Sequence, residues 1–559
     1  MNLQRILSTF SPEVRESTSM QGLVVLIQTL LEQLQATQEQ LTKSQEKIKI
    51  LEDELAKLRK TPKRPKFRPN TMQPRDRSNG SNNKIDKMPP SDNSSSAKKE
   101  MSEVIVKPLN IPDDSRFKGY QTFTIQDISL IAKEIVYKLE VWQSPNGDIL
   151  RGKLPEELQG QHFGSTLRAF ATNLYAQGMT QPSVHEFLRS IGIDLSSGQV
   201  NHILLNEAEA YSSVSEAILS TGLKEAPHIG ADDTGEKHQH KSGYCTYIGG
   251  QYFAYYKTSY SKSRENFLRI LLQGKEGYYI NEAMIWHLFQ SGVEDDILNL
   301  FEEYKEKSYR SIKGMNRLLN VLGLKAKKLR RQCIEAALVG FIQSTVLKPG
   351  QILISDRAGQ FALFDHSACW VHMERPLRKI ICTSEQVEQE LKGVRHAIWE
   401  LYHMLKEVSL SQVGKENVHK LYDALVALKT SSPEINAVID NFSVYREEML
   451  KALDHPGLPL HNNDSERDIR GVAKRRNISG STKSDLGRKF RDGLQSLKQT
   501  CFRVGYNFWD YMQRWFQRDP PDLVELVRQR YRPSACEIVI TLPQFFDSSK
   551  GCGISCLSA

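Results

Sequence analysis

The sequence predicts an α/β fold within a chain of several domains, and three observations lead to this prediction. Its 559 residues are three to four times the length of a usual domain. Aromatic and β-branched runs after residue 225 predict strands, and two of the apolar runs end in acids. Amphipathic stretches on both sides of these runs predict helices. Strands with acids at their ends, followed by helices, are typical of α/β proteins.

The N-terminal 60 residues predict a coiled coil. Apolar residues recur every seven positions, and a second set follows each of them by three, as the a and d positions of a heptad require. The first set is Ile27, Leu34, Leu41, Ile48 and Leu55. Because no second heptad stretch follows nearby, we favour a homo-oligomer over a helical hairpin within one chain.

Residues 61–105 are mostly Pro, Ser, Asn, Asp and Lys, and they predict a disordered basic linker. Residues 106–222 predict a helical region. It begins with a helix over 124–140 and continues with three short helices, the third capped by Ser196 or Ser197. Their spacing suits a DNA-binding helix-turn-helix, and a plain helical packing unit is an equal alternative.

Residues 223–515 predict the main domain. A strand ending at the acids of ADDTG is followed by a meander, and a second strand, QILIS, ends in an acid after a helical stretch over 282–346. Residues 384–454 predict a helical insertion, and two further helices close the domain. Residues 516–559 are expected to be a C-terminal tail.

Three acids could assemble a metal site: Asp232 and Asp356 after the two strands, and Glu466 in the first turn of a helix. Hard divalent cations prefer oxygen ligands, and a pair of them can stabilise the attacking and leaving oxygens of a phosphate. Each acid also has an ordinary alternative. Acids at strand ends are commonly solvated turn residues, and Asn463-x-x-Glu466 fits a helix capping box.

Charge and composition narrow the classes of function. The sequence has 75 Lys and Arg residues and 66 Asp and Glu residues, and much of the positive charge is concentrated in three segments that could bind phosphates. They are TPKRPKFRPNTMQPRDR, KAKKLRRQ and VAKRRNISGSTKSDLGRKFR. No apolar run is long enough to span a membrane and no secretion signal is evident, so we expect a cytoplasmic, nucleoid-associated protein. Eight cysteines without a CxxC pair argue against a disulfide framework or a four-cysteine zinc module.

Several long motifs, in order over residues 160–515, resemble the transposases of the bacterial insertion-sequence 66 family. The resemblance implies a ribonuclease-H-like catalytic domain that acts on DNA ends with Mg²⁺, or Mn²⁺ in its place. It also implies that Asp232, Asp356 and Glu466 are the catalytic, metal-binding triad. The motifs are ADDTG, SGYCTYIGGQYFAYY, SDRAGQF, CWVHMER, PLHNNDSERDIR and ISGSTKSDLGRKFRDGLQSLKQTC.

The resemblance also bears on residues near the triad. Asp233 stands where the family usually has glutamate, and we favour Asp232 because neighbouring strand residues point to opposite faces. Cys369 and His372 resemble a short Cys-His motif, interpreted as a structural feature near the site, with zinc binding as the minor alternative. Four basic residues are expected to hold phosphates, with a solvated helix face as their alternative: Arg467, Lys474, Arg475 and Arg476.

Two departures limit what the resemblance implies. Relatives commonly carry a cysteine-rich zinc finger before the catalytic domain, whereas residues 61–244 here contain no cysteine. His461 stands where many relatives have aspartate. The expected function is a DNA transposase that binds element ends and target DNA and oligomerises through the coiled coil. The alternatives are a resolvase-type or structure-specific nuclease, and a non-catalytic oligomeric DNA-binding protein.

Overall fold

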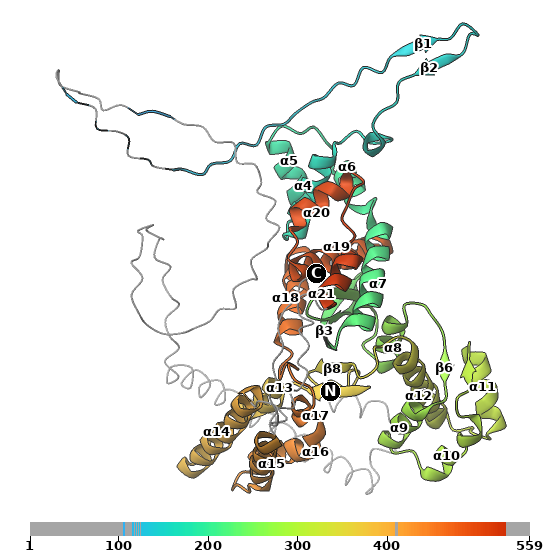
Figure 1. The fold of residues 1–559 in the computed structure, drawn as a ribbon, viewed down its shortest axis with the longest axis vertical. Helices are drawn as coiled ribbons and strands as arrows, with labels where there is room; N and C mark the ends of the chain where they lie inside the picture. The colour runs from blue at the N-terminus through green and yellow to red at the C-terminus, as the bar shows by residue number, and fades with distance from the viewer. Residues whose placement is uncertain are drawn as a thin grey trace, which may run out of the picture. The chain divides into compact units, whose positions relative to one another are not determined.

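The computed structural model describes residues 124–407 and 412–532, together with residues 104–106, 115, 116, 118, 120 and 122. The predicted coiled coil, almost all of the predicted linker and the chain after 532 lie outside the described residues. The described part is a mixed α/β structure (Figure 1). The α/β prediction is therefore confirmed at this level.

A five-stranded mixed sheet lies at the centre of the fold, in the order β5-β4-β3-β8-β9. The first three strands are antiparallel neighbours, and β8 and β9 continue the sheet parallel to β3. The strands are β3 (His228–His238), β4 (Lys241–Gly249), β5 (Ala254–Ser259), β8 (Ile352–Ser355) and β9 (Asp365–Ala368).

Strand β3 runs further than the sequence suggested, so the prediction that Asp232 follows the strand is wrong. The strand pairs with β4 along its whole length, as far as His238 opposite Lys241. Gln239 and His240 form a two-residue turn, and both have positive φ (48° and 62°), as tight hairpin turns require. Pairing with β8 ends at Gly230, so the second half of β3 pairs with β4 and, at its far end, through a bridge between His238 and Thr482.

Two C-terminal helices pack on the sheet. Apolar residues of α18 (Asn463–Ser479) contact buried tyrosines of β4 and β5. Helix α19 (Asp485–Val504) covers the free edge of β5 with Asp492, Ser496 and Thr500, spaced four apart. These side chains accept hydrogen bonds from the backbone N–H groups of Thr258, Tyr256 and Ala254. The helix thus satisfies an edge that would otherwise be open to another strand.

The short helices before the sheet share its hydrophobic core. Helices α4 (Ser165–Ala176), α5 (Gln181–Ser190), α6 (Ser197–Leu205) and α7 (Ala208–Glu225) contribute buried residues to the same cluster as β3 and α19. Ser196 caps α6 in a capping box with Gln199, as the sequence predicted. Helices α20 (Phe508–Phe516) and α21 (Leu523–Tyr531) join this core, so the expected tail is folded up to Tyr531.

The prediction of a helix over 124–140 is wrong. This stretch has no regular structure, and its apolar side chains, such as Ile128 and Ile131, are exposed. It leads into a small exposed hairpin, β1 (Val141–Gln143) and β2 (Ile149–Arg151), and then η1 (Glu156–Leu158). The spacing suited a helix, but a helix is stable only when its apolar face packs against something.

A helical subdomain lies between β5 and β8 in the sequence, and Figure 1 shows its helices α9, α11 and α12 beside one another. Its part from residue 282 onward corresponds to the predicted helical stretch over 282–346, divided into several elements. The elements of the whole subdomain are α8 (Arg264–Leu272), β6 (Tyr278–Tyr279), α9 (Glu282–Gln290), α10 (Asp295–Asn299), η2 (Glu302–Tyr304), β7 (Ser308–Tyr309), α11 (Ile312–Val321) and α12 (Lys327–Thr345).

A second helical insertion follows β9 and agrees with the helices predicted over 384–454. It has a hydrophobic core of its own around Trp370, Tyr422 and Phe442. Its elements are α13 (Trp370–Glu374), η3 (Arg375–Lys379), α14 (Glu385–Glu407), α15 (Gln412–Ala427), α16 (Pro433–Val444), α17 (Arg446–Leu450) and η4 (Lys451–Leu453). The insertion ends where the chain returns to the sheet as α18.

Candidate active site

Strand register brings Asp232 and Asp356 together. The parallel pairing joins His228 to Ile352 and Gly230 to Ile354. The same register continued by two residues sets Asp232 opposite Asp356. Each aspartate therefore lies just beyond the last paired residue, where neighbouring parallel strands diverge and leave room for a ligand.

The start of α18 is fixed directly against β3. Asn462, the residue before the helix, donates a hydrogen bond from its side chain to the carbonyl of Ala231 at 2.9 Å. A Cβ atom on Gly230 would overlap Ser465 Oγ, so only glycine allows the helix to come this close. The first turn of α18, with Glu466, is thereby held beside Asp232.

Glu466 does not cap its helix, so the capping interpretation is not supported. The helix begins at Asn463, and Asn462 before it makes no side-chain capping bond. Glu466 is one position too far along for a capping box. Its Oε2 accepts a hydrogen bond from Arg470 at 3.1 Å. Its Oε1 is buried and accepts none within the described residues, although His372 Nε2 and Arg375 Nη2 lie 3.4 Å and 3.5 Å away.

The electrostatics of Asp232 also show that the acids are close. Burial raises the pKa of Asp232 to about 7, against a hydrogen bond from the backbone N–H of Asp233 that lowers it. The negative charges of Asp356, Asp233 and Glu466 raise this pKa further. Several carboxylates thus share one half-buried place, an arrangement that bound positive charge would relieve.

Asp233 points to a different set of groups. Burial raises its pKa, the positive charge of Lys262 and a hydrogen bond from the side chain of Gln360 lower it, and the negative charge of Asp356 raises it further. Asp232 lies on the strand face of Gly230, which packs against α18, whereas Asp233 alternates to the other face. The period of two therefore places Asp232, and not Asp233, on the face of Glu466.

The Cys-His pair lies where β8 meets α18. The backbone N–H of Cys369 donates to the carbonyl of Ser355, and its buried sulfur accepts a bond from the N–H of Asn462 at 3.3 Å. Burial and the charge of Arg375 lower the pKa of His372, and the charges of Glu466 and Asp356 raise it. Cys369 thus connects the two elements that carry acids, and His372 faces both acids.

A hydrogen-bond network holds the residues on either side of Asp356. Arg357 has positive φ (64°), an unusual conformation for a residue with a side chain. Its guanidinium binds both oxygens of Glu448, at 2.6 Å and 2.7 Å, and stacks on Tyr445. His366 bridges Glu448 and the buried Ser355 hydroxyl, at 2.7 Å and 2.8 Å. These bonds fix the chain on both sides of Asp356.

The donor set fits a divalent cation in its chemistry. Among the described residues, Asp232 and Asp356 accept hydrogen bonds only from the backbone N–H groups of Asp233 and Ala358, and Glu466 Oε1 accepts none. Over residues 124–407 and 412–532, however, no three His, Cys, Asp or Glu side chains are gathered closely enough to hold a metal ion as they stand. Carboxylates without a counter-charge repel one another, which opposes closer approach.

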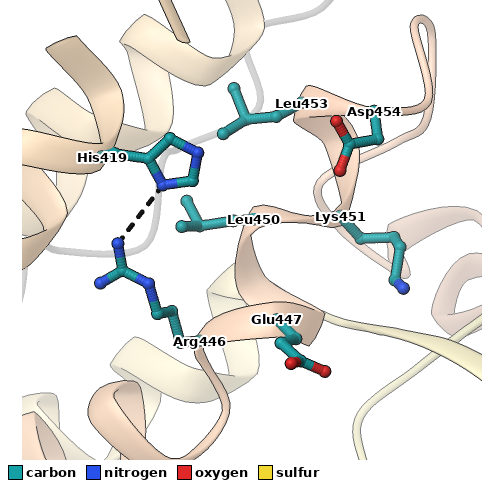
Figure 2. A pocket seen from close by; sticks show the side chains of 7 residues that line it. All are labelled: His419, Arg446, Glu447, Leu450, Lys451, Leu453 and Asp454. Atoms are coloured by element: carbon teal, nitrogen blue, oxygen red, sulfur yellow. Dashed lines mark hydrogen bonds between the residues drawn. The ribbon is translucent and has the colours of Figure 1, made fainter. Parts of the chain in front are cut away.

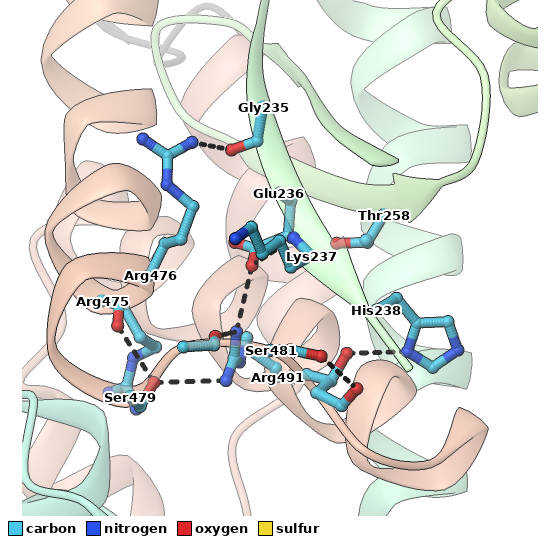
Figure 3. Close-up of polar contacts among 12 residues, drawn as sticks. Gly235, Glu236, Lys237, His238, Thr258, Arg475, Arg476, Ser479, Ser481 and Arg491 are labelled. Carbon is cyan, nitrogen blue, oxygen red and sulfur yellow. Dashed lines mark hydrogen bonds and ion pairs between the residues drawn. The ribbon is translucent and has the colours of Figure 1, made fainter. Parts of the chain in front are cut away.

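The four basic residues predicted to contact phosphates differ in their surroundings. Arg467 and Lys474 are exposed, and Arg467 lies 3.7 Å from Asp464. Arg475 stacks on the ring of Tyr175 and donates to its carbonyl. Arg476 donates to the carbonyl of Gly235, beside the buried ion pair of Glu236 and Arg491 (Figure 3). Arg475 and Arg476 thus already bind groups of the protein.

A cavity of about 280 Å³ lies within the second insertion and is separate from the acids. Figure 2 shows its lining, in which Arg446 contacts His419. Arg446 also pairs with Asp423, and Lys451 pairs with Asp365. Because both cations are already paired and no triad acid lines the cavity, it is not part of the candidate active site.

Comparisons with known proteins decide the family. The sequence pattern described as "Transposase IS66 family" matches residues 343–489. The chain is 31% identical over 299 residues to the uncharacterized protein y4jO of Sinorhizobium fredii, covering 53% of this chain and 93% of that protein. The chain belongs to the IS66 transposase family. The matched region contains Asp356, Cys369, His372 and Glu466, and it begins after Asp232.

Membership of the IS66 transposase family confirms the predicted resemblance and gives the chain a transposase role in processing DNA. Within the described part of the chain, no helix is long and apolar enough to cross a membrane.

Sequence reasoning missed several residues that this IS66 transposase brings to the acids. Arg375 follows His372 by three residues, a helical spacing that could have identified it. Asn462 stands in the quoted Asn-Asn motif, but its bond to Ala231 depends on the tertiary fold. Glu448 lies 91 residues from Arg357 and has no local signal.

Proposed function

We propose that this IS66 transposase cuts and joins the ends of its insertion sequence with a ribonuclease-H-like domain. The carrying observation is the register of β3 and β8, whose parallel pairing ends two residues before Asp232 and two residues before Asp356. The sheet supports this assignment, because three antiparallel strands followed by two parallel ones, in the order β5-β4-β3-β8-β9, is the ribonuclease-H arrangement.

We propose Asp232, Asp356 and Glu466 as the catalytic acids. Asp232 and Glu466 belong to facing surfaces of β3 and α18, and Asp356 lies across from Asp232. Oxygens from all three would hold Mg²⁺, with Mn²⁺ as a substitute. When bound, these ions supply the charge that stabilises the attacking and leaving oxygens of an in-line displacement at phosphorus.

The chain's own residues orient these acids. Asn462 and Cys369 hold the start of α18 against the sheet, and the Glu448 network holds the loop of Asp356. His372 and Arg375 lie beside the buried Oε1 of Glu466. The positive charge of Arg375, and that of the exposed Arg467 and Lys474, is suited to a DNA phosphate brought next to the acids.

Two displacements at phosphorus would complete the reaction. In the first, water attacks the scissile phosphate and the bond to the 3′ oxygen breaks, which releases a 3′ hydroxyl. In the second, that hydroxyl attacks a phosphate of target DNA, and the target's own 3′ oxygen leaves. Coiled-coil oligomerisation through residues 1–60 would bring two ends together.

The test uses the full chain, duplexes that carry the ends of its own element, and a labelled strand. In Mg²⁺ the parent should cut at the element end and then join the labelled 3′ end to a second duplex. Asp232→Asn and Asp356→Asn should bind the ends and do neither. Asp233→Asn is the matched control, because it removes the neighbouring charge on the other strand face.

Each alternative has its own outcome in the same assay. Cutting without joining would indicate a resolvase-type or structure-specific nuclease. End binding without any Mg²⁺-dependent cutting would indicate a non-catalytic DNA-binding protein. Full activity of Asp232→Asn would exclude that residue from the mechanism.

A further inference from the structure

The α11–α12 hairpin concentrates positive charge away from the acids. Residues 307–331 contain nine lysines and arginines and no aspartate or glutamate. The preceding stretch of the same subdomain, residues 282–306, has the opposite character, with seven acids and a single lysine. Charge is therefore separated along this subdomain rather than mixed, as it would be on an ordinary solvated surface.

Eight of the nine cations are exposed and make no ion pair or side-chain hydrogen bond with any residue that the structure describes. One of the eight, Lys307, lies over the ring of Tyr304, which leaves seven without such a contact. The acid that follows them in the sequence, Glu335, is already bound by Arg264 and His287 at 2.9 Å and 3.3 Å. We call these seven residues the hairpin surface: Arg310, Lys313, Arg317, Lys325, Lys327, Lys328 and Arg331.

Arg330 has a different role, because it holds the hairpin together. Its guanidinium donates to the side-chain oxygens of Asn320 and Asn316, at 2.9 Å and 2.6 Å. It also donates to the carbonyl of Leu324 in the connecting turn, at 2.8 Å. The start of α12 is therefore fixed against α11, and the exposed cations of both helices are presented from a rigid support.

The hairpin surface opposes the stability of its own helices. Lys313 and Arg317 are four residues apart on α11, as Lys327 and Arg331 are on α12, and like charges at this spacing repel. Helix α12 begins with these cations and has no acid in its first turn and no side-chain cap. Helix N-termini favour negative charge. A bound polyanion would relieve both effects.

We propose that the hairpin surface binds the phosphates of duplex DNA without reading its sequence. This proposal rests on the proposed function, which supplies DNA as the substrate. Asn and Gln side chains can recognise bases, but those near this surface already form hydrogen bonds within the protein. Asn316 and Asn320 accept from Arg330, and Gln332 donates to the carbonyl of Ser291. What the surface offers is charge, and phosphate contacts carry no direct sequence information.

Duplex DNA fits this surface better than an anionic membrane. An interfacial helix must place apolar residues in the lipid beside its cations. The central apolar residues of α11, Met315, Leu318 and Leu319, are buried in the protein instead. Its exposed apolar residues, Ile312 and Val321, stand at opposite ends of the helix and form no continuous apolar face. The remaining attraction is electrostatic, and a polyanion with regularly spaced phosphates gains most from it.

The test compares two full-chain variants that each lose four charges. The hairpin variant changes Arg317, Lys327, Lys328 and Arg331 to Gln. The control variant changes four exposed lysines of the second insertion to Gln: Lys379, Lys392, Lys420 and Lys429. Binding to a random duplex and to an element-end duplex is measured against salt in EDTA, so that it does not depend on cleavage.

The hairpin variant should bind both duplexes more weakly by the same factor, with a salt slope reduced by up to about 0.9 per lost phosphate contact. It should melt at or above the parental temperature, because it removes repulsion. Equal binding by the hairpin and control variants would overturn the proposal. A loss of binding confined to the element-end duplex would overturn it too. Binding to anionic phosphatidylserine vesicles is measured in parallel, and a loss of vesicle binding with unchanged DNA binding would also overturn the proposal. A parent that binds but never cuts would instead contradict the proposed function.

Discussion

Asp232 and Asp356 each lie two residues past the last pair of β3 and β8, and the negative charge of Asp356 raises the pKa of Asp232. Nothing local in either motif specifies this relationship. It follows from the register of two strands that are separated by a whole helical subdomain.

The first prediction concerns pH and Mg²⁺. Without metal, the pKa of Asp232 is raised from its ordinary 3.8 to about 7 by burial and by the neighbouring acids. The stability from this shift is present below pH 3.8 and is lost as the pH rises through about 7. Mg²⁺ requires the ionised form, so its stabilising effect should grow across the same range.

Melting curves at pH 5.5 and pH 8, with and without Mg²⁺, check this prediction. The parent should gain more from Mg²⁺ at pH 8 than at pH 5.5. Asp232→Asn should show no such difference. An equal gain at both pH values in the parent would show that Asp232 does not compete with protons for the ion.

The second prediction concerns the close contact between β3 and α18. Gly230→Ala places a methyl group against Ser465, so α18 should shift away from the strand. Unfolding free energy should fall by about 1–3 kcal/mol, as overpacking usually causes. Cleavage should fall more than stability explains, because Glu466 moves with the helix.

Gly393→Ala in α14 is the matched control, because a Cβ there meets nothing within 4 Å. It should leave cleavage unchanged and raise stability by up to about 1 kcal/mol. Parental cleavage by Gly230→Ala, measured at a temperature where both proteins are folded, would show that the contact does not position the site.

The third prediction concerns the network behind Asp356. Glu448→Ala leaves Arg357 and the buried His366 without their shared partner, which should lower the unfolding free energy by about 1–3 kcal/mol. Burial opposes ionisation of Glu448, but its bonds to His366 and Arg357 lower its pKa to about 2, so it is charged at neutral pH. The Mg²⁺ concentration for half-maximal cleavage should rise.

Glu447→Ala, at the exposed neighbouring position, is the control and should change neither the unfolding free energy nor the Mg²⁺ requirement. An unchanged Mg²⁺ requirement in Glu448→Ala would reduce the network to a stabilising role.

The fourth prediction concerns assembly. The heptads at 27–58 should oligomerise the chain, because an a/d seam is buried only against another helix. For a chain that starts at residue 105, the mass measured by light scattering should therefore be a smaller multiple of the mass of one chain. This shortened chain should still melt cooperatively. The same oligomeric state for both chains would place the interface elsewhere.

The sequence predicted most elements of the sheet and helices, and where it failed the cause was tertiary. Alternation along β3 correctly placed Asp232 and Asp233 on opposite faces, because this period is local. The capping alternative for Glu466 is not supported, because Asn462 and not Asn463 precedes the helix, and its side chain binds Ala231 across the interface. The helix expected over 124–140 has the right spacing but no surface to pack against. Pairs such as Arg357 and Glu448 depend on the fold and leave no sequence pattern.

The most direct test of the three-carboxylate site is strand cleavage by Glu466→Gln. Glutamine keeps the size of the side chain and its hydrogen bond to Arg470, so the protein should melt within a few degrees of the parent and bind element ends normally. A neutral amide is a poor ligand for a hard cation. This variant should therefore neither cut nor join labelled ends in Mg²⁺. Cleavage at the parental rate would contradict the three-carboxylate site.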